Sequence, residues 1–229
     1  LVVQDMFLTE TASLADVVLP ASSWAEKEGT FTGTDRRVQR FRKAIEPLWD
    51  SKPDWEILCT LAKEMKAGED FNFSSPAQIF EEMRQVTPSY AGISFAQLEQ
   101  PEGAQWPCPE EGHSGTPILH SLEFTRGKGK FHAINYRAPA ENPDDKFPFI
   151  LTTSRVIAQW HTRSMTGRSA TLNAEFPEGF LEINPEDAEK LGISNKSLVE
   201  VSSRRGKIQT KAMVTDMVAK GIVSMPFHF

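Results

Sequence analysis

The sequence has 229 residues, 39% of them hydrophobic and 24% charged, which is typical of a folded globular protein and excludes a disordered chain. At this length we expect two domains. The formal net charge of -6 excludes a generic nucleic-acid-binding protein, because such proteins need a basic face to neutralise phosphates.

The first twenty residues predict one turn of an open α/β sheet. Residues 1–5 indicate a buried parallel strand, residues 9–15 a short helix with a threonine cap, and residues 16–20 a second strand. Ligands of such sheets bind beyond the carboxyl ends of the strands, where Gln4 and Asp5 lie.

The two ends of the sequence suggest a piece of a longer chain. Residues 1–3 open in β-forming residues without a methionine, and residues 223–229 close without a polar tail. No apolar stretch approaches the roughly 18 residues of a transmembrane helix, so we expect no membrane segment.

A run of basic residues within positions 36–43 is the next feature, and acidic residues surround it. The basic members are Arg36, Arg37, Arg40, Arg42 and Lys43. We interpret this run as a solvated helix face.

Apolar residues at helical spacing predict two helices and a shorter one. Residues 51–65 predict a helix that packs on the sheet, with Ser51 or Asp54 near its start, and Cys59 within it reads as a core thiol. Residues 76–86 predict the second helix, and residues 95–98 the shorter one.

Prolines and glycines crowd residues 100–148, which predicts an ordered connector pinned to a surface by its aromatic residues. Those aromatics are Trp106, Phe124, Phe131 and Tyr136. Cys108 lies there between two prolines, where a free thiol is plausible, but a nucleophile would need a basic partner. Two cysteines 49 positions apart form neither a CxxC metal knuckle nor a disulfide framework, so we expect a reducing, cytoplasmic compartment.

Strand patterns dominate the remainder of the chain. They cover residues 149–153, 180–183, 197–202, 207–214 and 221–225. One short helix interrupts them, capped by Asn184 and ended by Gly192. We therefore predict an α/β domain over residues 1–99, a connector over 100–148, and a small β-barrel over 149–229 that is truncated.

Four stretches in this order resemble molybdopterin-guanine-dinucleotide oxidoreductases. The first comprises residues 4–12 (QDMFLTETA), 15–20 (ADVVLP) and 28–32 (EGTFT). The second and third, residues 36–40 (RRVQR) and 105–109 (QWPCP), look most like the formate dehydrogenase branch. The fourth comprises residues 151–155 (LTTSR), 160–167 (WHTRSMTG) and 182–188 (EINPEDA), and resembles the family's terminal double-psi β-barrel.

This resemblance implies oxidation of formate to carbon dioxide at a molybdenum or tungsten centre held by two molybdopterin guanine dinucleotides (bis-MGD). It also implies electron transfer through an iron–sulfur cluster to an acceptor or partner subunit. In the family the metal-ligating Cys or selenocysteine and the cluster cysteines lie in the amino-terminal part. We therefore expect this chain to contain no catalytic or metal-ligating residue and to be inactive without the missing part of the same polypeptide.

The resemblance implies a set of cofactor-binding positions. They are Gln4, Asp5, Asp54, Arg155, Gln159, Trp160, His161, Thr162 and Arg163. Asp5 can accept two parallel hydrogen bonds from a guanine edge, and the guanidinium of Arg155 suits a phosphate or a pterin carbonyl. Asp54 fits a helix cap as well as a nucleotide contact, and Trp160 fits a core position as well as a cofactor contact. Ser154 departs from the glycine that is common before this arginine in the family.

Three other functions fit the same residues. The chain could come from another molybdopterin enzyme, such as a nitrate reductase or the large iron–sulfur subunit of respiratory complex I. It could instead be a non-catalytic module that carries a pterin dinucleotide. The barrel could also be only a structural cap.

Overall fold

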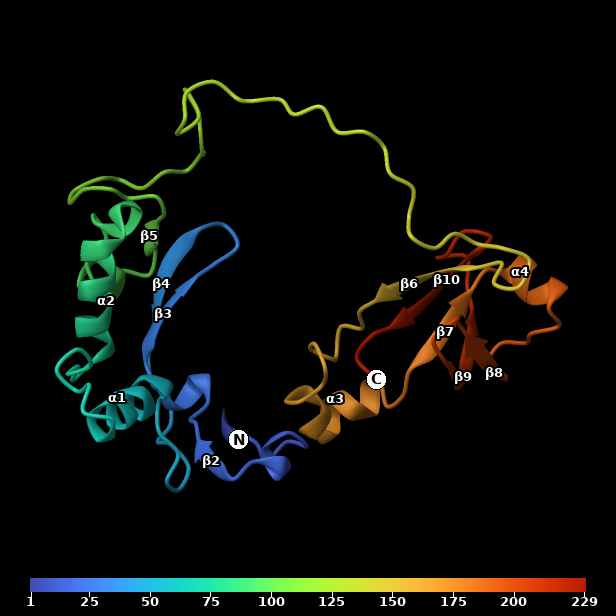
Figure 1. Ribbon diagram of the computed structural model, residues 1–229, viewed down its shortest axis with the longest axis horizontal. Helices are drawn as coiled ribbons and strands as arrows, with labels where there is room; N and C mark the ends of the chain where they lie inside the picture. Colours follow the sequence, from blue (N-terminus) through green and yellow to red (C-terminus); the bar gives the residue numbers. More distant parts are fainter. The chain divides into compact units, whose positions relative to one another are not determined.

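The chain folds into two units, Leu1–His132 and Ala133–Phe229, and each combines helices with β-sheets (Figure 1). The structure is a computed structural model that describes residues 1–229. None of its helices combines the length and the hydrophobicity that crossing a bilayer requires.

The first unit opens with two parallel strands, β1 (Val2–Asp5) and β2 (Val17–Pro20), joined through the single 3-10 turn η1 (Ala12–Leu14). The predicted order of strand, short helix and strand is confirmed. The predicted burial of the first strand is wrong, because Val2 is 62% exposed in this two-stranded sheet. The Thr9 hydroxyl accepts a hydrogen bond from the Ala12 amide at 3.2 Å and so helps to start the turn.

A three-stranded antiparallel sheet follows, built from β3 (Gly29–Thr32), β4 (Arg37–Phe41) and the short β5 (Ala104–Gln105). Residues 37–41 of the basic run lie on strand β4 and its other residues lie on no helix, so its interpretation as a helix face is wrong. Val38 is fully buried while Arg37 and Gln39 on either side of it are not, which is the two-residue period of a strand. The reversal before β4 is closed by the Gly33 amide, which donates to the Arg37 carbonyl at 2.8 Å.

Two helices of equal length follow this hairpin in the chain. Helix α1 (Asp54–Glu64) begins after Pro53, so the predicted capping roles of Ser51 and Asp54 are wrong. Cys59 on this helix is only half-buried, so it is not a core thiol. Helix α2 (Pro76–Val86) has the predicted bounds, and the Ser75 hydroxyl accepts from the Gln78 amide as its cap.

Single 3-10 turns account for the remaining helical structure of this unit. They are η2 (Trp24–Glu26), η3 (Pro88–Tyr90) and η4 (Gln97–Glu99). The helix predicted over residues 95–98 is thus a 3-10 turn shifted toward Glu99.

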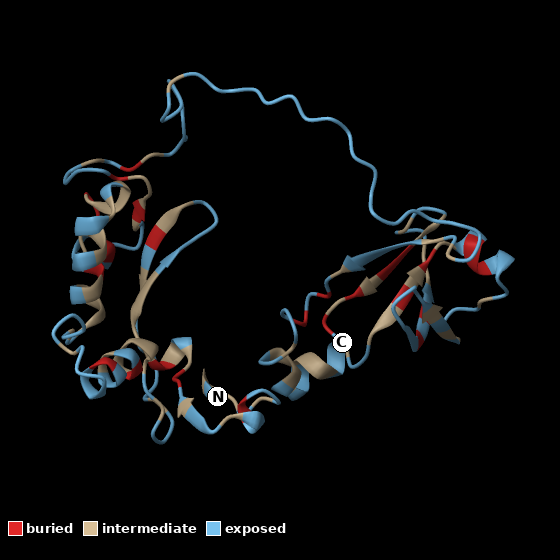
Figure 2. Cartoon of the chain, viewed as in Figure 1, coloured by how far each residue is buried: buried red, intermediate tan, exposed pale blue.

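The core of the first unit lies between α2 and the strands β4 and β5 (Figure 2). Its buried residues are Val38, Phe80, Ile93, Leu98, Ala104 and Cys108. The early part of the predicted connector thus belongs to this core, and the Trp106 ring nitrogen donates to the Ser89 hydroxyl at 2.9 Å. Further along, Phe131 and Tyr136 are 100% and 89% exposed, so they do not pin the segment to a surface.

The second unit is built on one mixed five-stranded sheet in the order β6-β10-β7-β9-β8. The strands are β6 (Ile150–Ser154), β7 (Phe180–Ile183), β8 (Leu198–Ser202), β9 (Lys207–Val214) and β10 (Ile222–Pro226). All five were predicted within one residue at either end. The buried cluster of this unit contains Leu181, Ile183, Ala188, Ala212 and Val223.

Helix α4 (Pro185–Lys190) was predicted with its cap, whereas η5 (Thr166–Arg168) and α3 (Ala170–Glu175) were not. The Asn184 side chain accepts from the Glu186 amide at 3.1 Å, and Gly192 adopts a φ of 66° just after the helix.

Strands β6 and β10 run parallel and in register, with Ser154 opposite Pro226. The segments that follow the two strands therefore leave the sheet at the same edge. The Phe227 amide extends this pairing by donating to the Ser154 carbonyl at 3.2 Å. This register brings residues 155–163 beside Phe227, His228 and Phe229.

Candidate cofactor-binding sites

The predicted residues fall into two groups, one in each unit. Gln4, Asp5 and Asp54 lie in the first unit, and the other six lie in the second, between Arg155 and Arg163.

In the first unit, the Gln4 amide nitrogen donates to Asp54 Oδ1 at 2.7 Å. The other carboxylate oxygen of Asp54 accepts a hydrogen bond from the Lys27 ammonium group. The end of β1 and the start of α1 are thus brought together by side chains, although 50 positions separate them in the chain. Lys27 was missed by the sequence reasoning, because only the fold brings it to Asp54.

The surroundings of Asp54 keep its carboxylate ionised. Burial alone would raise the pKa of Asp54, but hydrogen bonds from Lys27 and Gln4 outweigh burial, and the pKa is lowered from its ordinary value. An ionised carboxylate accepts hydrogen bonds and donates none, so any further partner of Asp54 must be a donor.

Asp5 is adjacent to Gln4 on β1, and its side chain points to the opposite face of the strand. Its Oδ1 accepts from the Phe7 amide at 2.9 Å, which fixes the carboxylate at the turn where the strand ends. Asp5 and the pair of Gln4 and Asp54 therefore face different sides of the strand end.

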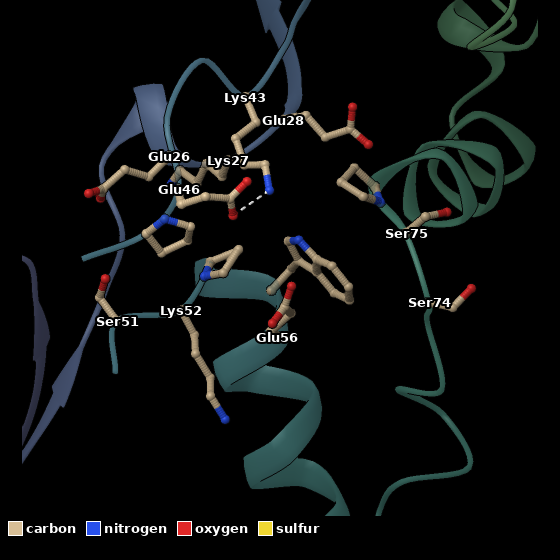
Figure 3. Close-up of a pocket in the computed structure, with 14 residues that line it drawn as sticks. Glu26, Lys27, Glu28, Lys43, Glu46, Ser51, Lys52, Glu56, Ser74 and Ser75 are labelled. Carbon is tan, nitrogen blue, oxygen red and sulfur yellow. Dashed lines mark hydrogen bonds and ion pairs between the residues drawn. The ribbon is translucent and has the colours of Figure 1, made fainter. Parts of the chain in front are cut away.

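A cavity of about 500 Å³ lies beside the start of α1 (Figure 3). Three lysines, four glutamates and Trp55 are among its lining residues. The charges offset one another locally, as where the Lys43 ammonium group donates to Glu46 at 2.8 Å. The lining thus shows no preference for a cationic or an anionic ligand.

In the second unit, Gln159 is buried, and its side chain joins residues 159–176 into one network. Its amide oxygen accepts from the Thr166 hydroxyl at 2.8 Å, and its amide nitrogen donates to Asn173 Oδ1 at 3.2 Å and to the Phe176 carbonyl at 3.3 Å. Gln159 therefore fixes the shape of the loop. The position was predicted as a cofactor contact, and its observed hydrogen bonds are internal.

Arg163 has one buried donor atom without a hydrogen-bond partner. One terminal nitrogen donates to Asn173 Oδ1 at 2.9 Å, and the guanidinium lies 4.4 Å from the centre of the Phe229 ring. The Nε atom is buried and has no hydrogen-bond partner. A buried donor left unpaired costs about 1–3 kcal/mol, so this arginine is suited to an acceptor that a ligand would bring.

The other predicted residues of this loop expose their side chains. Arg155 lies over the Phe227 ring at 5.2 Å, Trp160 is 67% exposed, and the Thr162 hydroxyl is 3.2 Å from that of Ser164. His161 is exposed, with its ring centre 4.8 Å from that of Trp160. A cationic group, an indole, an imidazole and a hydroxyl thus face solvent from one short segment.

The backbone of this loop is strained at two positions. His161 and Arg163 have φ values of 43° and 64°, in the left-handed region that residues other than glycine rarely adopt. Such conformations persist only where surrounding contacts impose them, and they gather at binding sites.

Three residues that impose this loop shape were missed by the sequence reasoning. Asn173 on α3 binds Gln159 and Arg163, and its amide nitrogen donates to the Gly167 carbonyl at 2.5 Å. His228 is buried and bonds to the Val156 amide and to the His161 carbonyl. The third is Phe229, the ring beside Arg163. No local sequence signal indicates the last two, because they follow β10, and only the fold pairs β10 with β6.

Two family models match the chain. One is described as molybdopterin oxidoreductase and matches residues 1–64, and the other is described as molybdopterin dinucleotide binding domain and matches residues 149–229. Residues 1–64 and 149–229 thus resemble two domains of the molybdopterin oxidoreductases.

Individual relatives sharpen this assignment. The chain is 53% identical over 231 aligned residues to the F420-dependent formate dehydrogenase subunit alpha of Methanocaldococcus jannaschii, covering 100% of this chain and 34% of the relative. It is 40% identical to formate dehydrogenase H of Escherichia coli, covering 100% of this chain and 32% of the relative. The chain therefore spans about a third of the length of the curated relatives it matches.

The solved structure of acetylene hydratase from Pelobacter acetylenicus has the same fold over this region. The TM-score is 0.70 at 20% sequence identity, with 98% of this chain and 32% of that chain covered. This likeness supports the mixed α/β architecture alone.

The residues of the second unit fit a pterin dinucleotide. The unpaired Nε of Arg163 and the exposed guanidinium of Arg155 are donors for phosphates and carbonyls, and Trp160 offers a flat apolar face. Charge, hydrogen-bonding groups and ring surface thus agree with the matched family.

Proposed function

We propose that this chain is part of the catalytic subunit of a formate dehydrogenase and forms part of its cofactor pocket. The observation that carries the proposal is the 53% identity to a formate dehydrogenase alpha subunit over the whole of this chain. The unpaired buried donor of Arg163 supports the role in cofactor binding.

The cofactor of the proposal is bis-MGD with molybdenum or tungsten, which when bound supplies the oxidation of formate to carbon dioxide. Arg155 and Arg163 would bind phosphates or pterin carbonyls, and Asp5 would accept hydrogen bonds from a guanine edge. Trp160, His161 and Thr162 would line the cofactor, while Gln159 holds their loop. Gln4 and Asp54 would contact the nucleotide from the first unit.

The remaining two thirds of the polypeptide would supply the metal ligand and the cysteines of an iron–sulfur cluster, since Cys59 and Cys108 cannot ligate a four-cysteine cluster by themselves. Cys108 is buried, and burial raises the pKa of its thiol, which disfavours the thiolate that a ligand or nucleophile needs. The proposal further includes an electron-transfer partner subunit and a cytoplasmic location.

Two features of architecture belong to the same proposal. Residues 1–99, with the early part of the predicted connector 100–148 that packs in their core, would end an α/β molybdopterin-binding domain. The rest of that connector would lead to a double-psi β-barrel over residues 149–229. The five-stranded mixed sheet with parallel pairs β6-β10 and β7-β9 supports the barrel.

The test uses the full-length protein that contains this sequence. We expect it to carry pterin and molybdenum or tungsten and to reduce a viologen dye with formate. If the protein instead oxidised the reduced dye with nitrate and showed no activity with formate, it would be assigned to the nitrate reductases. Pterin without either activity would favour a non-catalytic carrier, and absence of pterin would contradict the proposal entirely.

Two substitutions test the individual sites in the same protein. Arg155→Ala and Asp5→Asn should each lower pterin content without changing the thermal unfolding curve. Arg137→Ala and Asp70→Asn, at exposed positions, are the matched controls. Full pterin occupancy in both site variants would remove Arg155 and Asp5 from the proposed pocket.

A further inference from the structure

His228 joins the two ends of the segment 156–161, in the middle of which no helix or strand fixes the backbone. Its Nε2 accepts from the Val156 amide at 3.1 Å, and its Nδ1 lies 2.6 Å from the His161 carbonyl oxygen. The side chain is buried, at 3% exposure, and both ring nitrogens are used.

The two partners determine which nitrogen carries the proton. A backbone amide can only donate and a backbone carbonyl can only accept, so Nε2 must be unprotonated and Nδ1 must carry the hydrogen. Both hydrogen bonds exist together only in this neutral tautomer. An imidazolium, with a donor on each nitrogen, would lose the bond from Val156.

The neighbours of His228 contact the proposed ligands of the cofactor. Phe227 lies under Arg155 at 5.2 Å, and Phe229 lies beside Arg163 at 4.4 Å. His228 therefore sits between the two aromatic rings that contact these guanidinium groups, and it holds the backbone of His161, whose φ of 43° requires an imposed contact.

We propose that His228 is a positioning residue that holds the segment 156–161 in the conformation that binds the pterin dinucleotide. This inference rests on the proposed function. His228 does not itself touch the cofactor in the proposal; it acts through the Val156 amide and the His161 carbonyl.

The two hydrogen bonds can be removed one at a time. His228→Gln places an amide oxygen near the position of Nε2, where it can accept from Val156. His228→Asn places an amide nitrogen near the position of Nδ1, where it can donate to the His161 carbonyl. His228→Leu keeps the volume and loses both bonds. His132→Leu, at an exposed histidine, is the control.

The experiment follows pterin release from the purified full-length holoenzyme by fluorescence, together with hydrogen exchange of the Val156 amide. We expect release to be about tenfold faster in His228→Leu, intermediate in the Gln and Asn variants, and unchanged in His132→Leu. Exchange at Val156 should be about tenfold faster in the Leu and Asn variants and close to wild type in the Gln variant.

The amide of Ile183, in the core strand β7, separates positioning from a general loss of stability. Equal acceleration at Ile183 and Val156 would overturn the proposal, as would release rates that do not differ among the variants. A wild-type protein without pterin would instead contradict the proposed function, so the two failures are distinguishable.

Discussion

Asn173 forms side-chain hydrogen bonds with three residues of the candidate loop, although the sequence did not single it out. It accepts from Gln159 and Arg163 and donates to the Gly167 carbonyl. Removing it takes one hydrogen-bond partner each from Gln159, Arg163 and the Gly167 carbonyl, so we expect Asn173→Ala to destabilise the second unit by about 1–3 kcal/mol. Denaturant unfolding of the chain measures this change.

Asn135→Ala is the matched control, because Asn135 is exposed, and its effect should stay within about 0.5 kcal/mol. Equal stability of the two variants would show that the Asn173 network does not support the fold.

The lowered pKa of Asp54 makes a prediction about pH. A carboxylate with a lower pKa in the folded state stabilises the fold above its unfolded value and loses this contribution as pH falls through the folded one. Asp54→Asn should therefore cost up to about 1 kcal/mol at pH 7, since the group is half exposed, and almost nothing in strong acid. A penalty that is the same at both pH values would contradict this account.

For single residues, the resemblance indicated the positions of the candidate loop but not the residues that hold them. The motif placed Gln159, His161 and Arg163 in one loop, and the structure agrees. It could not indicate that Asn173 and His228 hold them. Asn173 lies on α3, which the sequence did not predict, and His228 follows β10, whose pairing with β6 is set by the fold.

For helices and strands, the sequence predicted an element correctly where the contacts that stabilise it lie within a few residues of one another in the chain. The apolar spacing of residues 76–86 predicted the bounds of α2, and the structure adds a local cap, because the Ser75 hydroxyl accepts from an amide three residues away. The interpretation of the basic run failed because it rested on charge. Its strand β4 pairs over four residues with β3 and over two with β5, and charge reveals neither partner.

Two glycines of the second unit allow the effect of backbone conformation on stability to be measured without a change in side-chain packing. A Cβ added at Gly192 or at Gly206 would meet no atom within 4 Å, but only Gly192 has a positive φ, of 66°. Gly192→Ala should cost about 1 kcal/mol, whereas Gly206→Ala should be neutral or stabilising by up to about 1 kcal/mol. Thermal unfolding of both variants measures the contrast, and equal shifts would show that the left-handed turn after α4 is not what requires glycine.

At the scale of the whole molecule, the sequence predicted mixed α/β structure and a change in character along the chain, because strand periodicity and turn residues are local. The order β6-β10-β7-β9-β8 could not be read in this way, since the neighbours β6 and β10 lie at opposite ends of the unit's sequence. The exposure of Val2 was also missed, since an apolar strand looks the same in sequence whether or not another layer covers it.

The division into two units predicts where a protease cuts the 229-residue chain first. Phe131 and Tyr136 flank the boundary between His132 and Ala133, are almost fully exposed, and lie outside every helix and strand. Chymotrypsin should therefore cleave there first, because exposed aromatic residues on unpaired backbone fit its site without prior unfolding. Mass spectrometry should then find two fragments that meet within residues 131–137.

Trp49 provides an internal comparison, since it is 94% exposed but its neighbour Leu48 donates its amide to Glu26 at 3.2 Å. Its loop should be cut more slowly than the boundary segment. Replacing both boundary aromatics, as Phe131→Ser with Tyr136→Ser, should abolish the early cut and leave the later ones unchanged. First cleavage inside β7 or β9 would mean that the second unit opens more readily than the segment between the units, against the division that the structure shows.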